Sequence, residues 1–251
     1  MATPTMEQRI SYQEKPKGSP VMFQSWENLL FLHWEVEPEV LLARIPKRLK
    51  LDLHDGRAYL GIVPFFMNNV RPRFFPTVPG LSNFLELNVR TYVYDQDGRP
   101  GVYFLSLDCN QALAVAIAKS RFHLPYYNAQ MSAVETDGII DFSCRREGHL
   151  QKGRYLWETP QGGEIAKPGT LEFFLLERYL LFSQRRNGEL FCGRVHHEPY
   201  QFSEAKVTKV GIEPLDWEQI PFKGAPVSAL ASRGVDVSIH ALKSIKMTKS
   251  E

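Results

Sequence analysis

The feature that most constrains the fold is a pair of alternating segments in the middle of the chain. In FLELNVRTYVYD, residues 84–95, the apolar residues Leu85, Leu87, Val89 and Val93 fall on one face with Thr91. Phe84, Glu86, Asn88, Arg90, Tyr92 and Tyr94 fall on the other face. This period of two is typical of a β-strand. The turn sequence QDGRPG then leads into VYFLSLDC, residues 102–109, and the two segments together predict an antiparallel hairpin.

Other segments predict further short strands. LKLDLHDGRAYLGIVPFF reads as a hairpin about Asp55-Gly56, a strong turn pair. A second hairpin turns at Asp137-Gly138. Its strands are expected at 127–136 and 139–146, and more strands at 153–159, 189–198, 204–212 and 234–244.

Three segments predict helices. EPEVLLARIP reads as a short helix with Pro38 in its first turn. QALAVAIAKSR, with Asn110 as N-cap, and TLEFFLLERYLLFS, with Thr170 as N-cap, are apolar almost all round, which is typical of buried helices. The pattern predicts an α+β fold of predominantly antiparallel β structure, a curved or closed sheet with two buried helices.

Composition limits the partners and the location of the protein. Thirty basic and 28 acidic residues leave a formal charge of +2, which argues against nucleic acid or a membrane surface as main partner. No apolar run approaches the ~20 residues of a membrane span, and the polar N-terminus lacks a signal-peptide core. Three widely spaced cysteines without a C-x-x-C motif indicate cytosolic thiols. We therefore expect a cytoplasmic protein, with a flexible tail at 1–20, one domain at 21–245 and a C-terminal tail at 246–251.

The face that carries Glu86, Asn88 and Arg90 is the first candidate site. On an open sheet it would meet solvent, but aromatic residues mixed with a few polar groups are also typical of a small-molecule cavity. At ~3.3 Å per residue Glu86 and Arg90 lie ~13 Å apart, so they cannot pair directly but could bracket a ligand. The sequence leaves both interpretations open.

The adjacent His196 and His197 raise the question of a metal site. On a strand they point to opposite faces, and the apolar neighbours indicate that His197 points inward. Zinc needs at least two further ligands, and no spacing links His33, His123 or Asp108 to this pair. We expect a hydrogen-bonded core or pocket histidine and no metal. GxSxG, GxGxxG and P-loop motifs do not occur, so no cofactor is predicted.

Several segments together resemble a known family. FLHWEVEPEVLLARIPKRLKLD, GIVPFFM, FLELNVRTYV, GVYFLSLD, FHLPYYNA, KPGTLEFFLLERYLLF and VHHEPY, spread over residues 22–243, look like the YqjF-like family of uncharacterised bacterial proteins. That family is distantly similar to the acetoacetate decarboxylase-like superfamily. The second likeness depends on IPKRLKLD, the aromatic-x-Glu strand at Phe84-Leu85-Glu86, and the turn Phe122-His123-Leu124-Pro125.

The superfamily resemblance implies a cone-like, acetoacetate-decarboxylase-like β-barrel with an enclosed, partly apolar pocket. In the decarboxylases the turn reads roughly F-G-F-P-K-K, and its first lysine forms a Schiff base with a keto acid. Here Tyr126 and Tyr127 stand where the lysines would, and a phenol cannot form an imine. Glu86 matches the pocket glutamate, and Lys119 is the nearest lysine. The resemblance therefore locates a site but does not supply its reaction.

We expect a protein that binds a small carbonyl- or carboxylate-containing molecule. Arg90 or Arg71 would hold a carboxylate, and tyrosine or histidine would bind an oxygen. The candidate pocket residues are Glu86, Asn88, Arg90, Asp108, His123, Tyr126, Tyr127, His197 and Arg71. Whether a reaction occurs stays open, as does the oligomeric state. The alternatives are a non-catalytic interaction protein, a lyase- or hydratase-type enzyme that uses Tyr/His/Glu acid-base chemistry, Schiff-base catalysis through Lys119, and a metal hydrolase.

Overall fold

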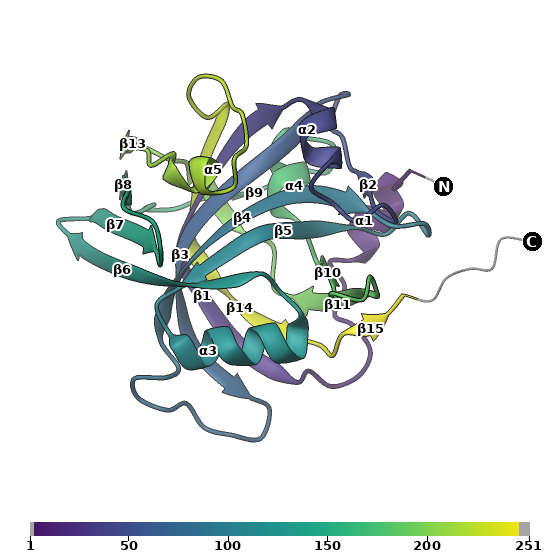
Figure 1. The fold of residues 1–251 in the computed structure, drawn as a ribbon, viewed down its shortest axis with the longest axis horizontal. Coiled ribbons are helices and arrows are strands. Elements are labelled where there is room, and N and C mark those ends of the chain that lie inside the picture. The colour runs from purple at the N-terminus through teal and green to yellow at the C-terminus, as the bar shows by residue number, and fades with distance from the viewer. Residues whose placement is uncertain (1–2, 246–251) are drawn as a thin grey trace, which may run out of the picture.

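The structure, a computed structural model, describes residues 3–245, and its strands form one curved sheet (Figure 1). The long strands are β1 (Met22–Val36), β3 (Ala58–Pro72), β4 (Phe84–Tyr94), β5 (Pro100–Cys109), β6 (Tyr126–Thr136) and β14 (Ser228–Ile239). The shorter ones are β2 (Lys50–Leu51), β7 (Ile139–Arg146), β8 (Gly153–Glu158), β9 (Glu164–Ile165), β10 (Leu180–Gln184), β11 (Leu190–His196), β12 (Gln201–Glu204), β13 (Val207–Lys209) and β15 (Lys243–Ser244). The helices are α1 (Met6–Ser11), α2 (Pro38–Leu42), α3 (Ala112–Ile117), α4 (Leu171–Leu176) and α5 (Glu213–Trp217), and a π-helical turn, η1 (Ala118–Phe122), extends α3.

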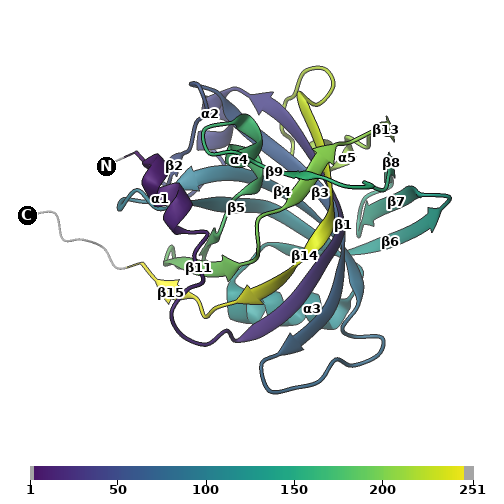
Figure 2. The same cartoon turned by 180° about the vertical axis from the view of Figure 1, so that it is seen from behind.

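Seven strands pair in a ring. The order β5-β10-β11-β14-β1-β3-β4 closes on itself because β4 also pairs with β5 (Figures 1 and 2). The sheet is mostly antiparallel, as predicted, although β10 and β6 each pair with β5 in parallel. A branch of four strands, β6-β7-β8-β13, leaves the ring at β5.

Both faces of β4 are buried, and the branch explains why. On the outer face, Leu87 and Val89 belong to one apolar cluster with Phe142 of β7 and Trp157 of β8. The inner face lies inside the ring. The face that carries Glu86, Asn88 and Arg90 is therefore directed to the interior of the ring and not to solvent.

The long strands of the ring bend at a defined place. Between Glu27 and Leu32 the register of β1 against β3 shifts, so that one extra residue is accommodated in β1. Asn28 has a φ of 52° there, and Gly234 opposite on β14 has a φ of 139°. A Cβ at Gly234 would overlap the Trp26 carbonyl oxygen, so only glycine fits.

Several predicted elements are confirmed. β4 and β5 form the expected hairpin with Tyr94 opposite Pro100. β6 and β7 turn at Asp137-Gly138, where both residues have positive φ. Thr170 caps α4 by accepting a hydrogen bond from the Phe173 amide, and α4 is buried as expected.

Other predictions are wrong. The segment 111–121 was expected to be a buried helix, but in α3 only Val115 is buried, because the apolar residues of α3 face the opening of a cavity. Its N-cap is Gln111 rather than Asn110. The predicted helix 170–183 ends at Leu176, and β10 follows. The hairpin at Asp55-Gly56 is reduced to one bridge, His54 to Arg57, because β2 pairs with β4 instead of β3.

The ends and the last strands also differ in detail. The strand expected at 204–212 is divided into β12 and β13, and β14 begins earlier than expected, at Ser228. The predicted N-terminal tail contains α1, whose Arg9 pairs with Asp52 at 2.6 Å. The predicted C-terminal tail, 246–251, lies outside the described residues.

Candidate functional site

A cavity of about 430 Å³ lies inside the ring. Strands β1, β3, β4, β5, β10, β11 and β14 contribute side chains to its wall, together with α3 and the loop between β3 and β4. The wall is largely apolar, with the rings of Trp26, Phe84, Phe104 and Phe122 among its members. A mostly apolar cavity of this size with a few polar side chains is typical of a small-molecule site.

Glu86 and Tyr126 form a hydrogen-bonded pair on the cavity wall. Leu107 of β5 pairs in parallel with Tyr126 of β6, and β4 pairs with β5 on the other side, so the two side chains point to one place. The Tyr126 hydroxyl donates to Glu86 Oε2 at 2.8 Å. Burial raises the pKa of Glu86 to about 8, although the Tyr126 hydrogen bond opposes this, and burial raises the pKa of Tyr126 well above its ordinary value. At neutral pH the pair is therefore mostly an uncharged carboxylic acid and an uncharged phenol.

Arg90 lines the same cavity farther along β4 and lacks a carboxylate partner. Of the buried arginines in residues 3–245, Arg146 and Arg178 each pair with a carboxylate, whereas Arg90 does not. Arg90 is 7% exposed and donates from Nη2 to the Leu175 carbonyl at 3.2 Å, and its Nε has no partner within the described part of the chain. A buried cation without a counter-ion is costly, so an anion in the cavity would be stabilised here.

Two residues that the sequence analysis did not single out lie at the Arg90 end of the cavity. Tyr200 and Arg90 both contact the Phe31 ring. The ring centroids of Tyr200 and Phe31 are 5.3 Å apart, and the guanidinium carbon of Arg90 lies 5.5 Å from the Phe31 centroid. Arg178 also lines the cavity and pairs with Asp52 at 2.6 Å. One feature of the sequence could have indicated that Arg178 is a site residue: it is a charged residue within the apolar run LLERYLLF. That run was predicted to be helical.

The sequence of this chain is similar to a protein family and to a bacterial protein. A family model, DUF2071, described as "Uncharacterized conserved protein (COG2071)", matches residues 23–236. The chain is also 37% identical over 196 residues to the "Uncharacterized protein YqjF" of Bacillus subtilis (strain 168), which covers 77% of this chain and 80% of that protein. The chain belongs to the DUF2071 family. The predicted YqjF-like resemblance is thereby confirmed.

Solved structures place the fold of this DUF2071 chain beside acetoacetate decarboxylase-like proteins. An acetoacetate decarboxylase from Legionella pneumophila superposes with a TM-score of 0.61 at 11% identity, covering 98% of both chains. An acetoacetate decarboxylase-like enzyme from Sphingomonas wittichii RW1 gives 0.63 at 11% identity, covering 92% of this chain and 95% of that one. The enduracididine biosynthesis enzyme MppR, complexed with pyruvate, gives 0.61 at 12% identity over 93% of both chains. At these identities the likeness establishes the fold and no more.

No lysine lies among the described residues that line the cavity of this DUF2071 protein. Tyr126, which stands at the position where the resemblance would place the reactive lysine, is at the cavity wall. Lys119 instead lines a second, more open groove on the outer side of β5 and β6, with Nζ 5.8 Å from the Tyr127 ring centroid. The geometry therefore gives no support to Schiff-base chemistry through Lys119.

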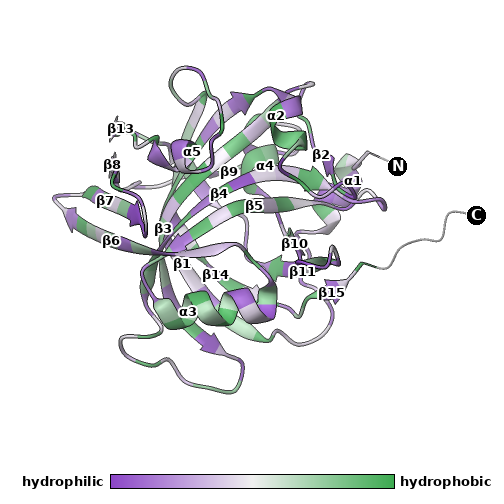
Figure 3. Cartoon of the chain, in the orientation of Figure 1, coloured by the Kyte–Doolittle hydropathy of each residue, from purple (hydrophilic) through white to green (hydrophobic). Residues whose placement is uncertain are grey.

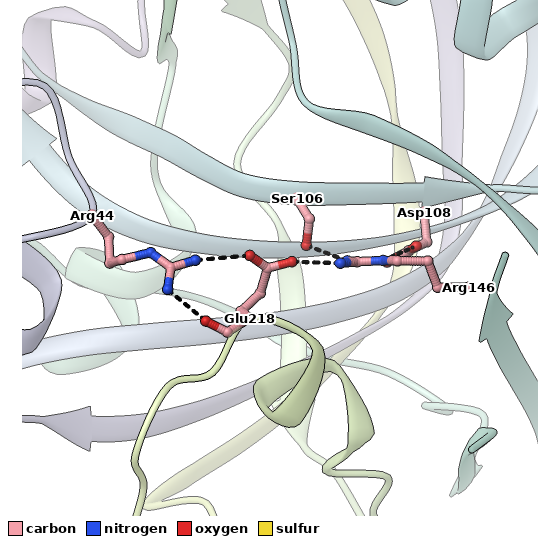
Figure 4. A network of polar contacts seen from close by, with 5 residues as sticks. All are labelled: Arg44, Ser106, Asp108, Arg146 and Glu218. Carbon is pink, nitrogen blue, oxygen red and sulfur yellow. Dashed lines mark hydrogen bonds and ion pairs between the residues drawn. The ribbon is translucent and has the colours of Figure 1, made fainter. Parts of the chain in front are cut away.

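Asp108 does not reach the cavity. It follows Leu107, so it points to the opposite face of β5, where Arg146 Nε donates to it at 2.7 Å. The same guanidinium donates to the Ser106 hydroxyl at 2.6 Å and to Glu218 Oε1 at 2.6 Å. The other carboxylate oxygen of Glu218, Oε2, accepts from Arg44 Nη2 at 3.1 Å (Figure 4). This buried network links the branch of the sheet to the ring and to the segment after α5.

His123 and Tyr127 also lie outside the cavity. Tyr127 is 41% exposed, and the Arg146 guanidinium lies 4.3 Å from its ring centroid on the outer face. His123 has a φ of 52°, which directs it into the outer groove, where Arg185 Nε donates to its Nε2 at 2.9 Å. A strand sends neighbouring residues to opposite faces, so only Tyr126 of the adjacent tyrosines faces inward.

The three remaining candidates are near the ring without lining the cavity. His197 is buried between the rings of Tyr179 and Tyr200, at 4.7 and 4.6 Å, and burial lowers its pKa to about 4. Arg71 lies over the Phe23 ring at 4.6 Å. Asn88 is buried on β4 between Glu86 and Arg90, and its Oδ1 has no hydrogen-bond partner within the described residues.

Residues 3–245 contain neither a candidate metal centre nor a candidate membrane-spanning helix. Within them, no group of three or more His, Cys, Asp or Glu side chains is arranged to hold a metal ion. None of the helices in that range has the length and apolar character needed to cross a bilayer.

Proposed function

We propose that this DUF2071 protein binds a small organic acid inside the ring of strands, which acts as a ligand-binding β-barrel. The carboxylate of the ligand pairs with Arg90, and a carbonyl or hydroxyl oxygen of the ligand faces Glu86 and Tyr126. The observation that carries the proposal is the buried charge of Arg90, which lacks a carboxylate partner within residues 3–245.

A bound carboxylate would remove the cost of that buried charge. An arginine and a carboxylate form a charge-assisted pair with directional hydrogen bonds, and the low polarity of the wall strengthens the attraction. Glu86 does not serve as this counter-ion, because with a pKa of about 8 it is mostly protonated at neutral pH. An external anion is therefore the natural partner of Arg90.

Glu86 and Tyr126 provide the second point of recognition. A protonated Glu86 has one oxygen that accepts from Tyr126 and a hydroxyl that can donate to a ligand oxygen. Four residues along a strand separate Glu86 from Arg90, a distance of roughly 13 Å. This separation is larger than a three-carbon acid can span, so contact with both Arg90 and Glu86 requires a longer ligand.

A structural neighbour binds a molecule of the same chemical class, a carboxylic acid. MppR, which shares the fold, is described in complex with pyruvate, a keto acid. Because the match is at 12% identity, it suggests only a class of molecule to test. The proposal itself depends on Arg90, Glu86 and Tyr126 of this chain.

The proposal is tested by measuring the thermal stability of the protein with a panel of organic acids, and by calorimetry for those that stabilise it. Arg90→Met should abolish the stabilisation by acids. It should cost the free protein little stability, because the buried charge that it removes has no carboxylate partner and the Leu175 carbonyl still accepts from the Tyr92 hydroxyl at 3.0 Å. Arg71→Met is the matched control, since Arg71 lies on the Phe23 ring outside the cavity. Equal loss of binding in both variants, or retained binding in Arg90→Met, would reject the proposal.

A second candidate function is favoured by the pKa of Glu86. A carboxylic acid with a pKa of about 8 beside a tyrosine hydroxyl can take up and release a proton near neutral pH, as a lyase- or hydratase-type reaction requires. Neither His123 nor His197 lines the cavity, so Glu86 would carry this role with Tyr126 alone. Deuterium exchange at the carbon next to the ligand carbonyl, followed by NMR with wild type and Glu86→Gln, tests it.

A further inference from the structure

The opening of the cavity is apolar. Residues that both line the cavity and are exposed mark the place where it reaches the surface. They come from the loop between β3 and β4 and from α3, and they are Phe75, Val78, Leu81, Leu113 and Ile117, each between 42% and 64% exposed. Gln111 Nε2 donates to the Gly80 carbonyl at 2.8 Å and thus joins the loop to α3. Figure 1 shows both segments at the same end of the ring, and Figure 3 shows apolar bands along α3.

The polar side chains near this opening are already bonded within the protein. Gln24 accepts from Trp26 Nε1 at 2.9 Å, and the Ser82 hydroxyl accepts from the Val78 amide at 2.8 Å. The polar groups that remain for a ligand are therefore the Glu86–Tyr126 pair and the side chains at the Arg90 end of the cavity, which are Arg90, Arg178 and Tyr200. A ligand that extends from Arg90 to the surface meets apolar wall on both sides of Glu86.

The volume also exceeds what a very small acid needs. A protein cavity of about 150 Å³ is known to hold a benzene molecule, and this one measures about 430 Å³. An acid of three or four carbons would leave most of the apolar wall without contacts, and unfilled apolar wall forfeits the packing energy.

We propose that the ligand is an amphipathic acid. Its carboxylate lies at Arg90, and its alkyl or aryl chain follows the wall to the opening formed by α3 and the β3–β4 loop. This inference rests on the proposed function for the carboxylate and adds the class of the rest of the molecule. It also gives a reason for the exposed apolar residues of α3, which a tail emerging from the cavity would cover.

Calorimetry with butyrate, hexanoate and octanoate tests the inference, at concentrations below micelle formation. Each methylene that leaves water for the wall contributes about 0.8 kcal/mol, so Kd should fall about fourfold per added methylene. A Kd that is the same for butyrate and octanoate overturns the inference, even if Arg90→Met abolishes the binding of both and so supports the proposed function. A Kd that falls with chain length but is unchanged in Arg90→Met rejects the proposed function instead.

A variant at the opening gives an independent result. Leu113→Glu places a carboxylate where the tail should emerge, and at 50% exposure this position tolerates a charge. It should weaken dodecanoate, whose longer chain can pass Glu86 and reach the opening, at least tenfold and leave butyrate unchanged. Leu150→Glu is the control, since Leu150 is 91% exposed and does not line the cavity. Equal dodecanoate affinity in Leu113→Glu and Leu150→Glu would overturn the proposed path of the tail.

Discussion

Tyr126 donates a hydrogen bond of 2.8 Å to Glu86, and the two residues come from strands that are separated in the sheet by β5. The bond joins the segment that follows the outer helix α3 to the start of β4, at the wall of the cavity. Burial keeps the pKa of Glu86 at about 8 in spite of this bond, so the pair contains a group that can exchange a proton near neutral pH.

The first prediction concerns the pH dependence of stability. Glu86 has a pKa of about 8 in the folded protein, against 4.5 for the unperturbed group. The folded state therefore binds more protons than the unfolded state between these values, so stability is full below about pH 4.5 and falls as pH rises toward 8. The slope from this one group is at most about 1.4 kcal/mol per pH unit.

Glu86→Gln removes the titrating group and should remove this slope. The measurement is urea unfolding of wild type and variant at several pH values between 5 and 8. The difference in unfolding free energy between the two proteins should change by about 1 kcal/mol per pH unit, in favour of the variant as pH rises. Glu164→Gln, at an exposed position, is the control and should leave the slope as it is. A parallel pair of curves for wild type and Glu86→Gln would contradict the prediction.

The second prediction separates the adjacent tyrosines. Tyr126→Phe removes a donor to a buried carboxyl, which should cost about 1 kcal/mol of stability. Because the Tyr126 hydrogen bond lowers the pKa of Glu86, its loss should move that pKa above 8. The shift is measured from the carboxyl signal of Glu86 by NMR as a function of pH. Tyr127→Phe is the matched control, because Tyr127 is 41% exposed on the outer face, and neither quantity should change in it.

Strand periodicity accounts for the part of the site that could be predicted. The alternation in 84–95 placed Glu86 and Arg90 on one face, and both line the cavity. The same rule, applied to Tyr126 and Tyr127, would have separated them. It was not available there because β6 was expected to begin one residue later, at 127, with Tyr126 in the preceding turn.

Contacts between distant segments account for the part that could not be predicted. Arg178 was read as a helical residue, yet the helix ends before it, and its guanidinium meets Asp52, 126 positions away in sequence. Asp108 was a pocket candidate, but Arg146 and Glu218 hold it in a network on the outer face of β5. The local sequence pattern around Asp108 or Arg178 does not indicate such partners, because they come together only when the sheet closes.

The third prediction concerns Schiff-base chemistry. With pyruvate or acetoacetate and borohydride, the mass of the protein should not increase, because no lysine lies among the described residues of the cavity wall. Peptide mapping checks Lys119 in particular, whose Nζ lies over Tyr127 in the outer groove. A reduced adduct on Lys119 would mean that this side chain reaches a bound keto acid, contrary to its position in the structure.

The fourth prediction concerns the network of Arg146. Arg146→Ala would leave the buried carboxyls of Asp108 and Glu218 without their shared cation, so it should cost about 3–5 kcal/mol of stability. Urea unfolding measures the change. Arg154→Ala breaks an ion pair on the neighbouring strand, with Asp141 at 2.6 Å, but that arginine is 50% exposed, so the cost should stay below about 1 kcal/mol.

A double variant distinguishes loss of the charge pair from loss of packing. In Arg146→Met with Asp108→Asn, one carboxylate is removed with the cation and the volume of the arginine stem is largely retained. This protein should be more stable than Arg146→Met alone, which keeps the same side-chain volume, because less uncompensated charge remains buried. If the double variant is no more stable than Arg146→Met alone, the network does not stabilise the fold through charge pairing, and the packing of the Arg146 guanidinium against Tyr127 and Trp217, at 4.3 and 5.1 Å from their ring centroids, would be the larger contribution.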